Sequence, residues 1–227
     1  VFHEAAITDT TVMDQMKMMR ANVEAFRDLL AWAAKAKVKK VVYASSAGTY
    51  GDAPVPMRED AKAQPMNVYG FSKAVMDNVA ANAKGVKAVG LRYFNVFGPR
   101  EAHKGKVASM IWQLCLQMKA GRRPRIFEFG TQYRDFIYIK DVVDANLKAF
   151  AKAPSGVYNV CTGRKTDFNA IVAELNAALR TSFQPEYFKN PYAFYQNETL
   201  GDPAKSCKAF GFTASWTVER GVHDYIV

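Results

Sequence analysis

The chain has 227 residues, of which 49% are hydrophobic and 23% are charged, so it can bury a substantial core. No apolar run approaches the length of a membrane span, which predicts a protein that is not embedded in a membrane. The three cysteines are far apart and lack a metal-type spacing, which indicates buried thiols in a reducing compartment and predicts no metal site.

The formal net charge of +10 raises the question of a polyanionic partner. The basic residues are scattered and cluster only in KAKVKK (35–40) and GRRPR (121–125), neither of which has interleaved aromatic residues. Nucleic-acid binding is therefore the less favoured interpretation, and salt-dependent binding to a duplex would be needed to revive it. A basic surface also suits small polyanions such as nucleotide diphosphates, which is the interpretation we prefer.

Strands and helices alternate along the first half of the chain. VFHEAA (1–6) reads as the end of a buried strand, and VKKVVYASS (38–46) and VKAVGLRYF (86–94) read as further strands. Between them, we expect a helix over residues 14–36 and a second one from the N-cap Asn67 to about Ala83. The apolar stripe of the first helix consists of Met16, Met19, Val23, Phe26, Leu30 and Ala33.

The alternation continues in the second half. A charged, glycine-rich loop (98–106) precedes a helix over 107–120, for which Gly121 is the expected C-cap. The remaining expected elements are strands at 126–129, 135–139 and 156–160, helices at 141–153 and 167–180, and helices starting at Asp202 and Thr217. Such alternation predicts an α/β fold with a parallel sheet.

Three segments follow the expected strands directly, namely HEAAIT, SSAGTYG and NVFGPR. Ligands of parallel α/β sheets bind beyond the carboxyl ends of the strands. Because all three segments lie at such ends, we expect them to meet in one ligand site.

Tyr69 and Lys73, in NVYGFSK (67–73), fall one turn apart on the same face of a helix. A tyrosine has a pKa near ~10, and a neighbouring ammonium favours the phenolate and lowers that pKa, which would make Tyr69 an acid/base. The spacing alone fits an ordinary helix start with a solvated lysine at least as well, because short patterns recur by chance. A hydroxyl of Ser45 or Ser46 can either contact a substrate oxygen or complete a polar turn.

SSAGTYG, NVYGFSK and RYFNVFGPR, in this order, resemble the extended short-chain dehydrogenase/reductases. RYFNVFGPREAHKGKVAS, RDFIYIKDVVDANL and YQNETLGD further resemble the ADP-L-glycero-D-manno-heptose 6-epimerases, and the resemblance covers essentially the whole chain. It implies a Rossmann-type doubly wound parallel sheet, formed by residues 1–98 and 141–162. A smaller α/β domain for the nucleotide-sugar would comprise residues 99–140 and 163–227.

The resemblance also implies roles for individual residues. Tyr69 would be one acid/base, Lys73 its partner on the nicotinamide ribose, Ser46 the residue that orients the reacting oxygen, and Lys104 the second catalytic base. The implied cofactor-binding residues are Glu4, Ala5, Ala6, Ile7, Thr8, Asn22, Lys73 and Val96. The implied substrate-binding residues are Asn95, Lys106, Gln113, Phe127, Glu128, Phe129, Gly130, Arg134 and Tyr195.

The implied activity is epimerisation at C-6 of an ADP-heptose through a ketone, with tightly bound NADP or possible use of NAD. Inversion of an unactivated carbinol needs removal and return of hydride on opposite faces, and one base on each side, Tyr69 and Lys104, would match this need. Without the resemblance, Lys104 would read as a solvated loop lysine. The product would feed the inner core of lipopolysaccharide, which implies a cytoplasmic homo-oligomer, by resemblance a pentamer.

The chain departs from the family pattern in several places. Ala102 stands where glycine is frequent, Lys106 stands where serine is frequent, and His103 reads as a brace of its loop. No GxxGxxG turn, which lets the backbone approach a pyrophosphate, occurs in the chain. We therefore expect that the first βαβαβ half of the nucleotide fold is missing and that this segment alone does not turn over.

Three alternatives remain open at this point. A UDP-hexose 4-epimerase or related reductase shares the same acid/base pattern. A 4,6-dehydratase would call for an Asp-Glu pair where Ala47 and Gly48 stand. A non-catalytic nucleotide-sensing module is disfavoured by the intact Ser46, Tyr69 and Lys73.

Overall fold

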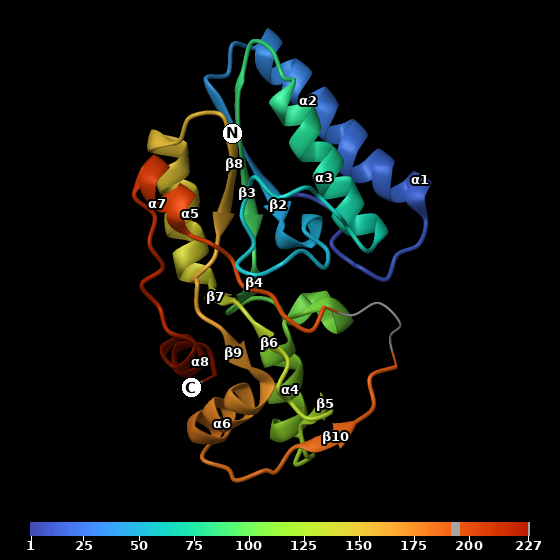
Figure 1. Cartoon of the computed structure of the whole chain (residues 1–227), viewed down its shortest axis with the longest axis vertical. Helices are drawn as coiled ribbons and strands as arrows, with labels where there is room; N and C mark the ends of the chain where they lie inside the picture. Colours follow the sequence, from blue (N-terminus) through green and yellow to red (C-terminus); the bar gives the residue numbers. More distant parts are fainter. Residues whose placement is uncertain (192–195, 227) are drawn as a thin grey trace.

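The computed structural model describes residues 1–191 and 196–226. Its largest sheet has four strands, all parallel, in the order β1-β2-β3-β8, which confirms the expected α/β fold (Figure 1). The strands are β1 (Phe2–His3), β2 (Lys40–Ser46), β3 (Lys87–Tyr93) and β8 (Gly156–Val160). Their register sets Ser46 opposite Tyr93, so the carboxyl ends of the central strands lie at one edge of the sheet.

Helices cover both faces of this sheet, as a doubly wound fold requires (Figure 1). On one face, α2 (Ala25–Lys35) and α3 (Val68–Ala81) pack on Val41, Tyr43 and Ala88. On the other face, α5 (Ile139–Lys152) and α7 (Ala204–Phe210) pack on Val42, Val89 and Leu91. Neighbouring strand residues thus point into two different cores, which explains why the strands read as unbroken apolar runs.

The expected helix over 14–36 forms, but it contains one π-helical segment. α1 (Gln15–Met18) continues into η1 (Met19–Glu24) and then into α2. A π turn contains extra backbone and shifts the helix face by about one residue. The expected apolar stripe is therefore wrong at its start, because Met16 is 82% exposed and Met18 is fully buried in its place.

The second half of the chain lies mostly below the sheet in Figure 1 and has its own apolar core. Its helices are α4 (Met110–Lys119), α6 (Phe168–Leu179) and α8 (Val218–Ile226), and η3 (Ala102–Val107) is a short 3-10 segment where a loop was expected. Its strands are β4 (Asn95–Phe97), β5 (Arg125–Phe127), β6 (Tyr133–Arg134), β7 (Phe136–Tyr138), β9 (Thr166–Asp167) and β10 (Glu186–Phe188). Of these strands, β4, β6, β9 and β10 were not predicted, and the helix expected at 107 begins only at Met110.

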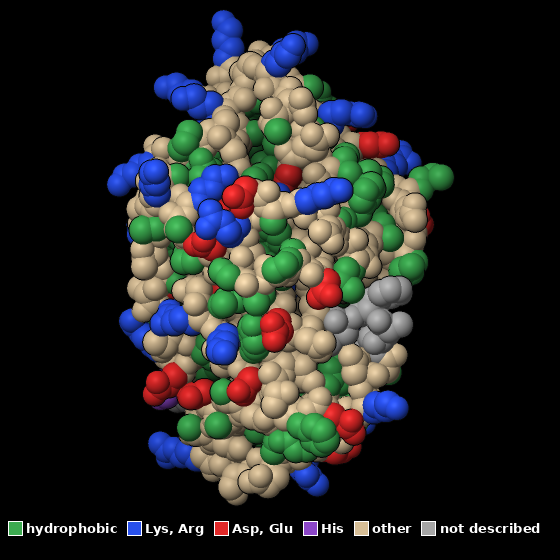
Figure 2. All heavy atoms as spheres, in the orientation of Figure 1, with side chains coloured by type: hydrophobic (Ala, Val, Ile, Leu, Met, Phe, Trp, Pro, Cys, Tyr) green, Lys and Arg blue, Asp and Glu red, His purple; other side chains and the backbone are tan. Residues whose placement is uncertain are grey.

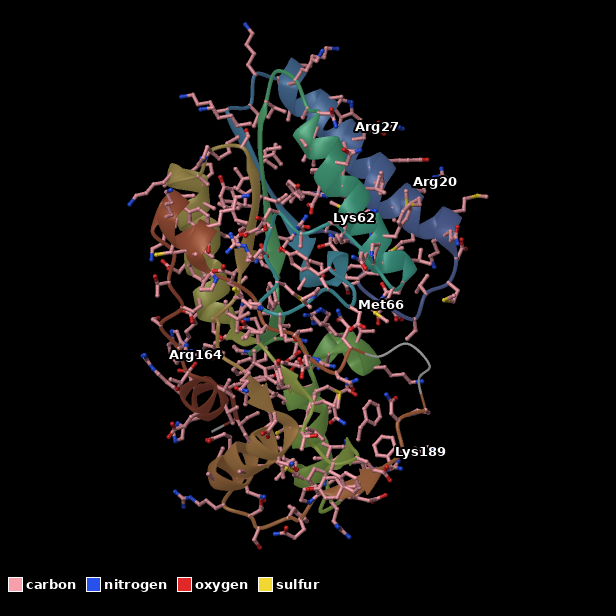
Figure 3. The ribbon with its side chains drawn as sticks, viewed as in Figure 1. Arg20, Arg27, Lys62, Met66, Arg164 and Lys189 are labelled. Atoms are coloured by element: carbon pink, nitrogen blue, oxygen red, sulfur yellow. The ribbon has the colours of Figure 1, made fainter. Side chains whose placement is uncertain are left out.

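Positive side chains are spread over the molecule. On the face in Figure 2, Lys and Arg side chains are dispersed with Asp and Glu between them. Figure 3 shows Arg20 and Arg27 along one helix, and Lys62, Arg164 and Lys189 on other parts of the chain. Within residues 1–191 and 196–226, no helix has both the length and the apolar character needed to cross a bilayer.

Candidate active site

Two glycines bring the end of β2 into contact with the start of α3. Gly70 packs so closely on Gly48, in η2 (Ala47–Thr49), that a Cβ atom on Gly70 would lie 2.4 Å from the Gly48 carbonyl oxygen. A Cβ atom on Gly48 would itself lie 3.3 Å from Ser46 Oγ and 3.8 Å from the Tyr69 ring. Only glycine fits at position 70 without a backbone shift, and this close approach sets Ser46 beside Tyr69.

The local sequence also fixes both ends of this contact. Asn67 is the N-cap of α3, as predicted, and its Oδ1 accepts a hydrogen bond from the Gly70 amide at 2.8 Å. Ser46 Oγ accepts one from the Gly48 amide at 3.0 Å. Both side chains therefore hold the backbone from which the site is built.

Lys73 lies one turn after Tyr69 on α3. Its Nζ is 5.8 Å from the centroid of the Tyr69 ring and donates a hydrogen bond to the Ala44 carbonyl oxygen at 2.7 Å. The side chain is 1% exposed. An ammonium has three N–H donors, and Ala44 is its one hydrogen-bond acceptor among the described residues, so donors remain for a ligand at the strand ends.

The electrostatics of this pair correct one expectation. Burial raises the pKa of Tyr69, and a hydrogen bond with Ser46 only partly opposes that effect. Burial also lowers the pKa of Lys73 to about 8, although Asp77 and Glu4 favour its charged form. The expectation of a lowered Tyr69 pKa is therefore wrong, because burial has the largest effect on the phenol and raises its pKa.

Asn22 is fully buried and anchors the segment that follows β1. Its Oδ1 accepts a hydrogen bond from the Ile7 amide at 2.8 Å, and its Nδ2 donates to the Ile7 carbonyl oxygen at 3.0 Å. Nδ2 also donates to Ser72 Oγ at 3.0 Å, and that hydroxyl donates to the Tyr69 carbonyl oxygen at 2.7 Å. Asn22 thus connects the expected cofactor segment, residues 4–8, to the helix that carries Tyr69.

The residues at the end of β1 have the chemistry to hold the ribose and nicotinamide part of a dinucleotide. Glu4 Oε2 accepts a hydrogen bond from Tyr93 Oη at 3.0 Å, and burial raises the pKa of the Glu4 carboxyl group. His3 Nε2 and Ser45 Oγ are buried without a hydrogen-bond partner. These polar atoms and the remaining donors of Lys73 fit a ligand that carries hydroxyl groups.

Lys104 and Lys106 lie in η3, the green helical turn below the lower end of α3 in Figure 1. Both side chains are exposed, and within the described residues no hydrogen bond or ion pair joins Lys104 to Tyr69 or Lys73. Gln113 Nε2 donates to the carbonyl oxygens of Lys106 and Ala108, at 3.1 and 2.8 Å. Gln113, expected to contact substrate, therefore also holds the end of this turn.

A buried carboxylate closes the loop that carries Lys104. Glu101 Oε2 accepts a hydrogen bond from the Ser109 amide at 2.6 Å, and Oε1 accepts one from Ser109 Oγ at 2.7 Å. The Glu101 carbonyl oxygen accepts one from the Lys104 amide at 2.9 Å. Glu101 is 4% exposed. Its buried carboxylate thus holds the loop on the protein interior, while the Lys104 side chain faces solvent.

Asn95 and Arg134 both form hydrogen bonds with the segment 197–199. Asn95 Oδ1 accepts a hydrogen bond from Thr199 Oγ1 at 3.1 Å. Arg134 is buried, donates to the Asn197 carbonyl oxygen at 3.1 Å and lies over the Phe168 ring, with 5.7 Å between guanidinium and centroid. Val96 is partly buried against the α5 core, and Tyr195 lies outside the described residues.

Asp135 is a second buried carboxylate that organises this region. Its oxygens accept hydrogen bonds from Thr162 Oγ1 at 2.7 Å and from the amides of Thr162, Gly163 and Gly201 at 2.8, 2.9 and 3.1 Å. Its own carbonyl oxygen accepts one from the Asn95 amide at 3.1 Å. Burial raises the pKa of Asp135, and these hydrogen bonds oppose that effect.

The segment from Phe127 to Gly130 lies in the lower part of the molecule. The Glu128 amide donates to the Phe188 carbonyl oxygen at 3.1 Å, and the Phe129 ring is 68% exposed. The strand expected over 126–129 is shorter, because β5 ends at Phe127. Within the described residues, no hydrogen bond or ion pair joins Glu128 to Tyr69 or Lys73.

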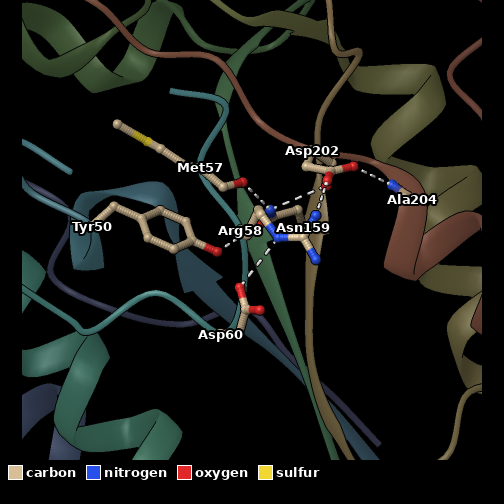
Figure 4. A network of polar contacts seen from close by, with 7 residues as sticks. All are labelled: Tyr50, Met57, Arg58, Asp60, Asn159, Asp202 and Ala204. Carbon is tan, nitrogen blue, oxygen red and sulfur yellow. Dashed lines mark hydrogen bonds and ion pairs between the residues drawn. The ribbon is translucent and has the colours of Figure 1, made fainter. Parts of the chain in front are cut away.

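The segment between η2 and α3 is held by the network in Figure 4. Tyr50 Oη donates to Asn159 Oδ1 at 2.6 Å, and Asn159 Nδ2 donates to the Met57 carbonyl oxygen at 2.9 Å. Arg58 forms an ion pair with Asp202 at 3.1 Å. These contacts fasten the connection between Ser46 and Tyr69 to the end of β8.

His103 is exposed in η3, and no cluster of metal-ligating side chains is found in residues 1–191 and 196–226. The expected role of His103 as a brace of its loop stays a prediction.

Residues 1–161 match the NAD dependent epimerase/dehydratase family. The chain belongs to this family. Over 99% of its length it is similar to the ADP-L-glycero-D-manno-heptose-6-epimerase of Helicobacter pylori, at 44% identity and a TM-score of 0.92, and it covers 70% of that chain. The predicted resemblance to this kind of enzyme is thereby confirmed.

Two further solved structures align with the whole chain. The UDP-glucose 4-epimerase of Thermotoga maritima is 28% identical, with a TM-score of 0.91 and 75% of that chain covered. The UDP-N-acetylglucosamine 4-epimerase of Methanobrevibacter ruminantium is 26% identical, with a TM-score of 0.93 and 74% covered. These likenesses confirm the Rossmann-type fold and the enzyme class of the nucleotide-sugar epimerases.

Several residues that shape the site were missed by sequence reasoning. Asp77 follows Lys73 by four positions, so the helical spacing that relates Tyr69 to Lys73 could have identified it. Glu101 and Asp135 stand in motifs that were noticed. Ser109, the partner of Glu101, ends the same motif, whereas the partners of Asp135 lie 27 to 66 residues away.

Proposed function

We propose that the protein converts ADP-D-glycero-D-manno-heptose to ADP-L-glycero-D-manno-heptose by oxidation and re-reduction at C-6. The observation that carries this proposal is the meeting of Ser46, Tyr69 and Lys73 at the strand ends, in a chain 44% identical to the H. pylori epimerase. A lysine-bearing turn, η3, supplies the second group that an inversion needs.

Tyr69 reacts as phenolate, which is the minor form because burial raises its pKa. It takes the proton of the C-6 hydroxyl group while the C-6 hydrogen leaves as hydride, and Ser46 orients the oxygen. Hydride returns to the opposite face of the resulting ketone, and the Lys104 ammonium gives a proton to the oxygen. Both groups then exchange protons with solvent.

A nicotinamide dinucleotide, when bound, supplies the hydride acceptor and donor of this reaction. We propose that Lys73, Glu4, Asn22, Val96 and the backbone of residues 5–8 hold it, with NADP preferred and NAD possible. Lys73 would donate to a ribose hydroxyl with the N–H groups that Ala44 does not use.

The nucleotide-sugar would be held by the lower part of the molecule. The proposed residues are Asn95, Lys106, Gln113, Phe127, Glu128, Phe129, Gly130, Arg134 and Tyr195. A guanidinium such as Arg134 matches a diphosphate in geometry and charge. We further propose the two-domain division given above, a place in lipopolysaccharide inner-core synthesis, a cytoplasmic location and a pentameric assembly.

A second candidate is a UDP-hexose 4-epimerase, because the T. maritima enzyme of that kind aligns with the entire chain. A third, of another class, is a nucleotide-sensing module without turnover.

A substrate comparison separates the three. The purified protein, loaded with NADP or NAD, is incubated with ADP-D-glycero-D-manno-heptose or with UDP-glucose, and products are resolved by chromatography. We expect conversion of the heptose alone, and faster with NADP. Formation of UDP-galactose would favour the second candidate, and binding of both sugars without conversion would favour the third.

A further inference from the structure

A buried polar cluster lies one helical turn behind Lys73. Asp77 Oδ2 accepts a hydrogen bond from Arg92 Nε at 2.9 Å, and Asp77 Oδ1 accepts one from Tyr43 Oη at 3.0 Å. The guanidinium of Arg92 lies over the Tyr50 ring, 4.8 Å from its centroid. Asp77 and Arg92 are 8% and 6% exposed, and both tyrosines are fully buried.

Stability alone does not account for this cluster. Removing two charges from water costs several kcal/mol per ion, and well-packed apolar side chains of similar volume are often equally stable. The cluster also leaves Arg92 Nη1 buried without a hydrogen-bond partner. The arrangement therefore fits a requirement for a fixed carboxylate at this place.

In the ion pair of Asp77 with Arg92, Asp77 is the residue on the same helix as Lys73. Lys73 and Asp77 stand four residues apart and so share one face of α3. Burial lowers the pKa of Lys73, and Asp77, followed by Glu4, opposes this effect. No ion-pair contact joins Lys73 to Asp77 among the described residues; one turn of α3 separates them, and the Asp77 carboxylate pairs with Arg92.

The other titratable groups near Lys73 do not replace this charge. From the end of β1, Glu4 contributes less than Asp77. Burial, followed by the ammonium of Lys73, lowers the pKa of His3. From α3, the neutral Tyr69 ring is 5.8 Å from Nζ. From β2 and β3, Tyr43 and Arg92 bind the Asp77 carboxylate itself.

We propose that Asp77 is a positioning residue whose carboxylate, fixed by Arg92 and Tyr43, keeps Lys73 cationic and held at the Ala44 carbonyl group. This inference rests on the proposed function of the site, in which a cationic Lys73 supports Tyr69 and a ribose hydroxyl. Asp77 itself touches neither substrate nor cofactor in this account.

The test is a titration of Lys73 by NMR in protein carrying ¹³Cε-labelled lysine, with the signal assigned by its loss in Lys73→Arg. We expect Asp77→Asn to weaken proton binding by Lys73 by about ten-fold or more, since the variant removes a charge and keeps the shape. The matched control Tyr43→Phe removes a hydrogen bond from the same carboxylate but keeps the charge, so we expect less than about a three-fold change. An unchanged Lys73 titration in folded Asp77→Asn would overturn the inference.

The double variant Asp77→Leu with Arg92→Met serves if Asp77→Asn does not fold, because it removes both charges of the pair together. We expect a weakening of proton binding that is smaller than in Asp77→Asn, because loss of the Arg92 charge acts in the opposite direction, and an unchanged titration would again overturn the inference.

Activity provides an independent readout. In Asp77→Asn, the loss of kcat should be larger at pH 8 than at pH 6.5. The reason is that Lys73 of the variant would deprotonate at a lower pH than Lys73 of the wild type and would be mostly neutral at pH 8. General structural damage would instead lower kcat equally at both pH values. Equal loss at the two pH values would contradict a role of Asp77 in the reaction. If the wild-type protein epimerises no nucleotide-sugar while the titration shifts as expected, the proposed function fails and the coupling of Asp77 to Lys73 stands.

Discussion

On the sheet side of the site, Tyr69 and Lys73 are set by a capped helix, and the close contact of Gly48 with Gly70 places Ser46 beside them. On the loop side, Lys104 is exposed on η3, and the side chains of Glu101 and Gln113 hold its loop. Regular elements thus fix the group for one proton transfer, and a loop carries the proposed group for the other.

This contrast has a physical reason. Strand ends and helix starts fix the positions of side chains closely, and proton transfer at Tyr69 requires a closely fixed position. Loops vary readily and adapt to different ligands, which suits a side of the site that faces the sugar. We therefore expect substitutions on the sheet side to abolish chemistry, and substitutions on the loop side to act on one direction of the reaction or on substrate binding.

Tyr69→Phe should produce the largest effect. Removal of the phenolic oxygen removes the acid/base, and kcat for epimerisation should fall by about 10²- to 10⁴-fold. The measurement is the initial rate with the NADP-loaded protein, with circular dichroism to verify folding. Tyr158→Phe, which loses a hydroxyl bonded to Pro154 near the opposite end of the sheet, should keep full activity. Retention of activity in Tyr69→Phe would remove Tyr69 from the mechanism.

Lys104→Met should be nearly as damaging to turnover, by about 10²-fold or more, but in a different way. Oxidation of one C-6 epimer should survive and oxidation of the other should be lost, because each base serves one face. The absorbance at 340 nm on addition of each epimer reports the two half-reactions separately. Tyr69→Phe should show the converse preference, and equal loss of both half-reactions in Lys104→Met would contradict the two-base account.

Lys106→Met is the matched comparison within the same turn. Lys106 is exposed like Lys104, and we place it at the substrate, so KM should rise while kcat changes little. A large fall in kcat would show that the positive charge of the loop matters more than the position of Lys104.

Gly70→Ala tests the geometry of the sheet side. The new Cβ atom would lie 2.4 Å from the Gly48 carbonyl oxygen, so the start of α3 must move away from η2. A displacement of about 1 Å should lower kcat by about 100-fold, and the strain should reduce the free energy of unfolding by about 1–3 kcal/mol. Chemical denaturation and rate measurements check both values. Wild-type kcat in this variant would show that the close contact does not set the distance between Ser46 and Tyr69.

Much of the sheet side could be predicted from the sequence, because its signals are local. Asn67 as N-cap, the turn between Tyr69 and Lys73, and the strand at 156–160 all follow from spacing and residue type. The π-helical segment Met19–Glu24 was not predicted; it contains Asn22, whose hydrogen bonds reach residues 15 and 50 positions away. The pKa of Tyr69 was predicted in the wrong direction because the sequence shows the neighbouring charge but not the burial.

The loop side was less predictable. Strands of two or three residues, such as β6 and β9, pair only in the folded chain and leave no periodic pattern. Glu101 looked like one more charge in a charged loop, and only the position of Ser109 shows that its carboxylate closes the loop.

Glu101→Gln should have a smaller effect on turnover than Lys104→Met. Glutamine keeps one acceptor oxygen but loses the charge, so the loop should loosen and the step that depends on Lys104 should slow by about ten-fold. The step that depends on Tyr69 should be unaffected, as followed again by the absorbance at 340 nm with each epimer. Slowing of both steps to the same extent would mean that Glu101 supports the fold in general and not this loop.

The measurement that tests the central claim most directly is ¹H NMR of the reaction in D₂O. The loaded wild-type protein is supplied with ADP-D-glycero-D-manno-heptose, and hydrogen at C-6 of the product is observed. The account predicts the L-glycero epimer with protium at C-6, because hydride leaves that carbon and returns to it without exchange with solvent. Deuterium at C-6 would show removal and return of a proton at carbon, which would contradict oxidation and re-reduction as the mechanism.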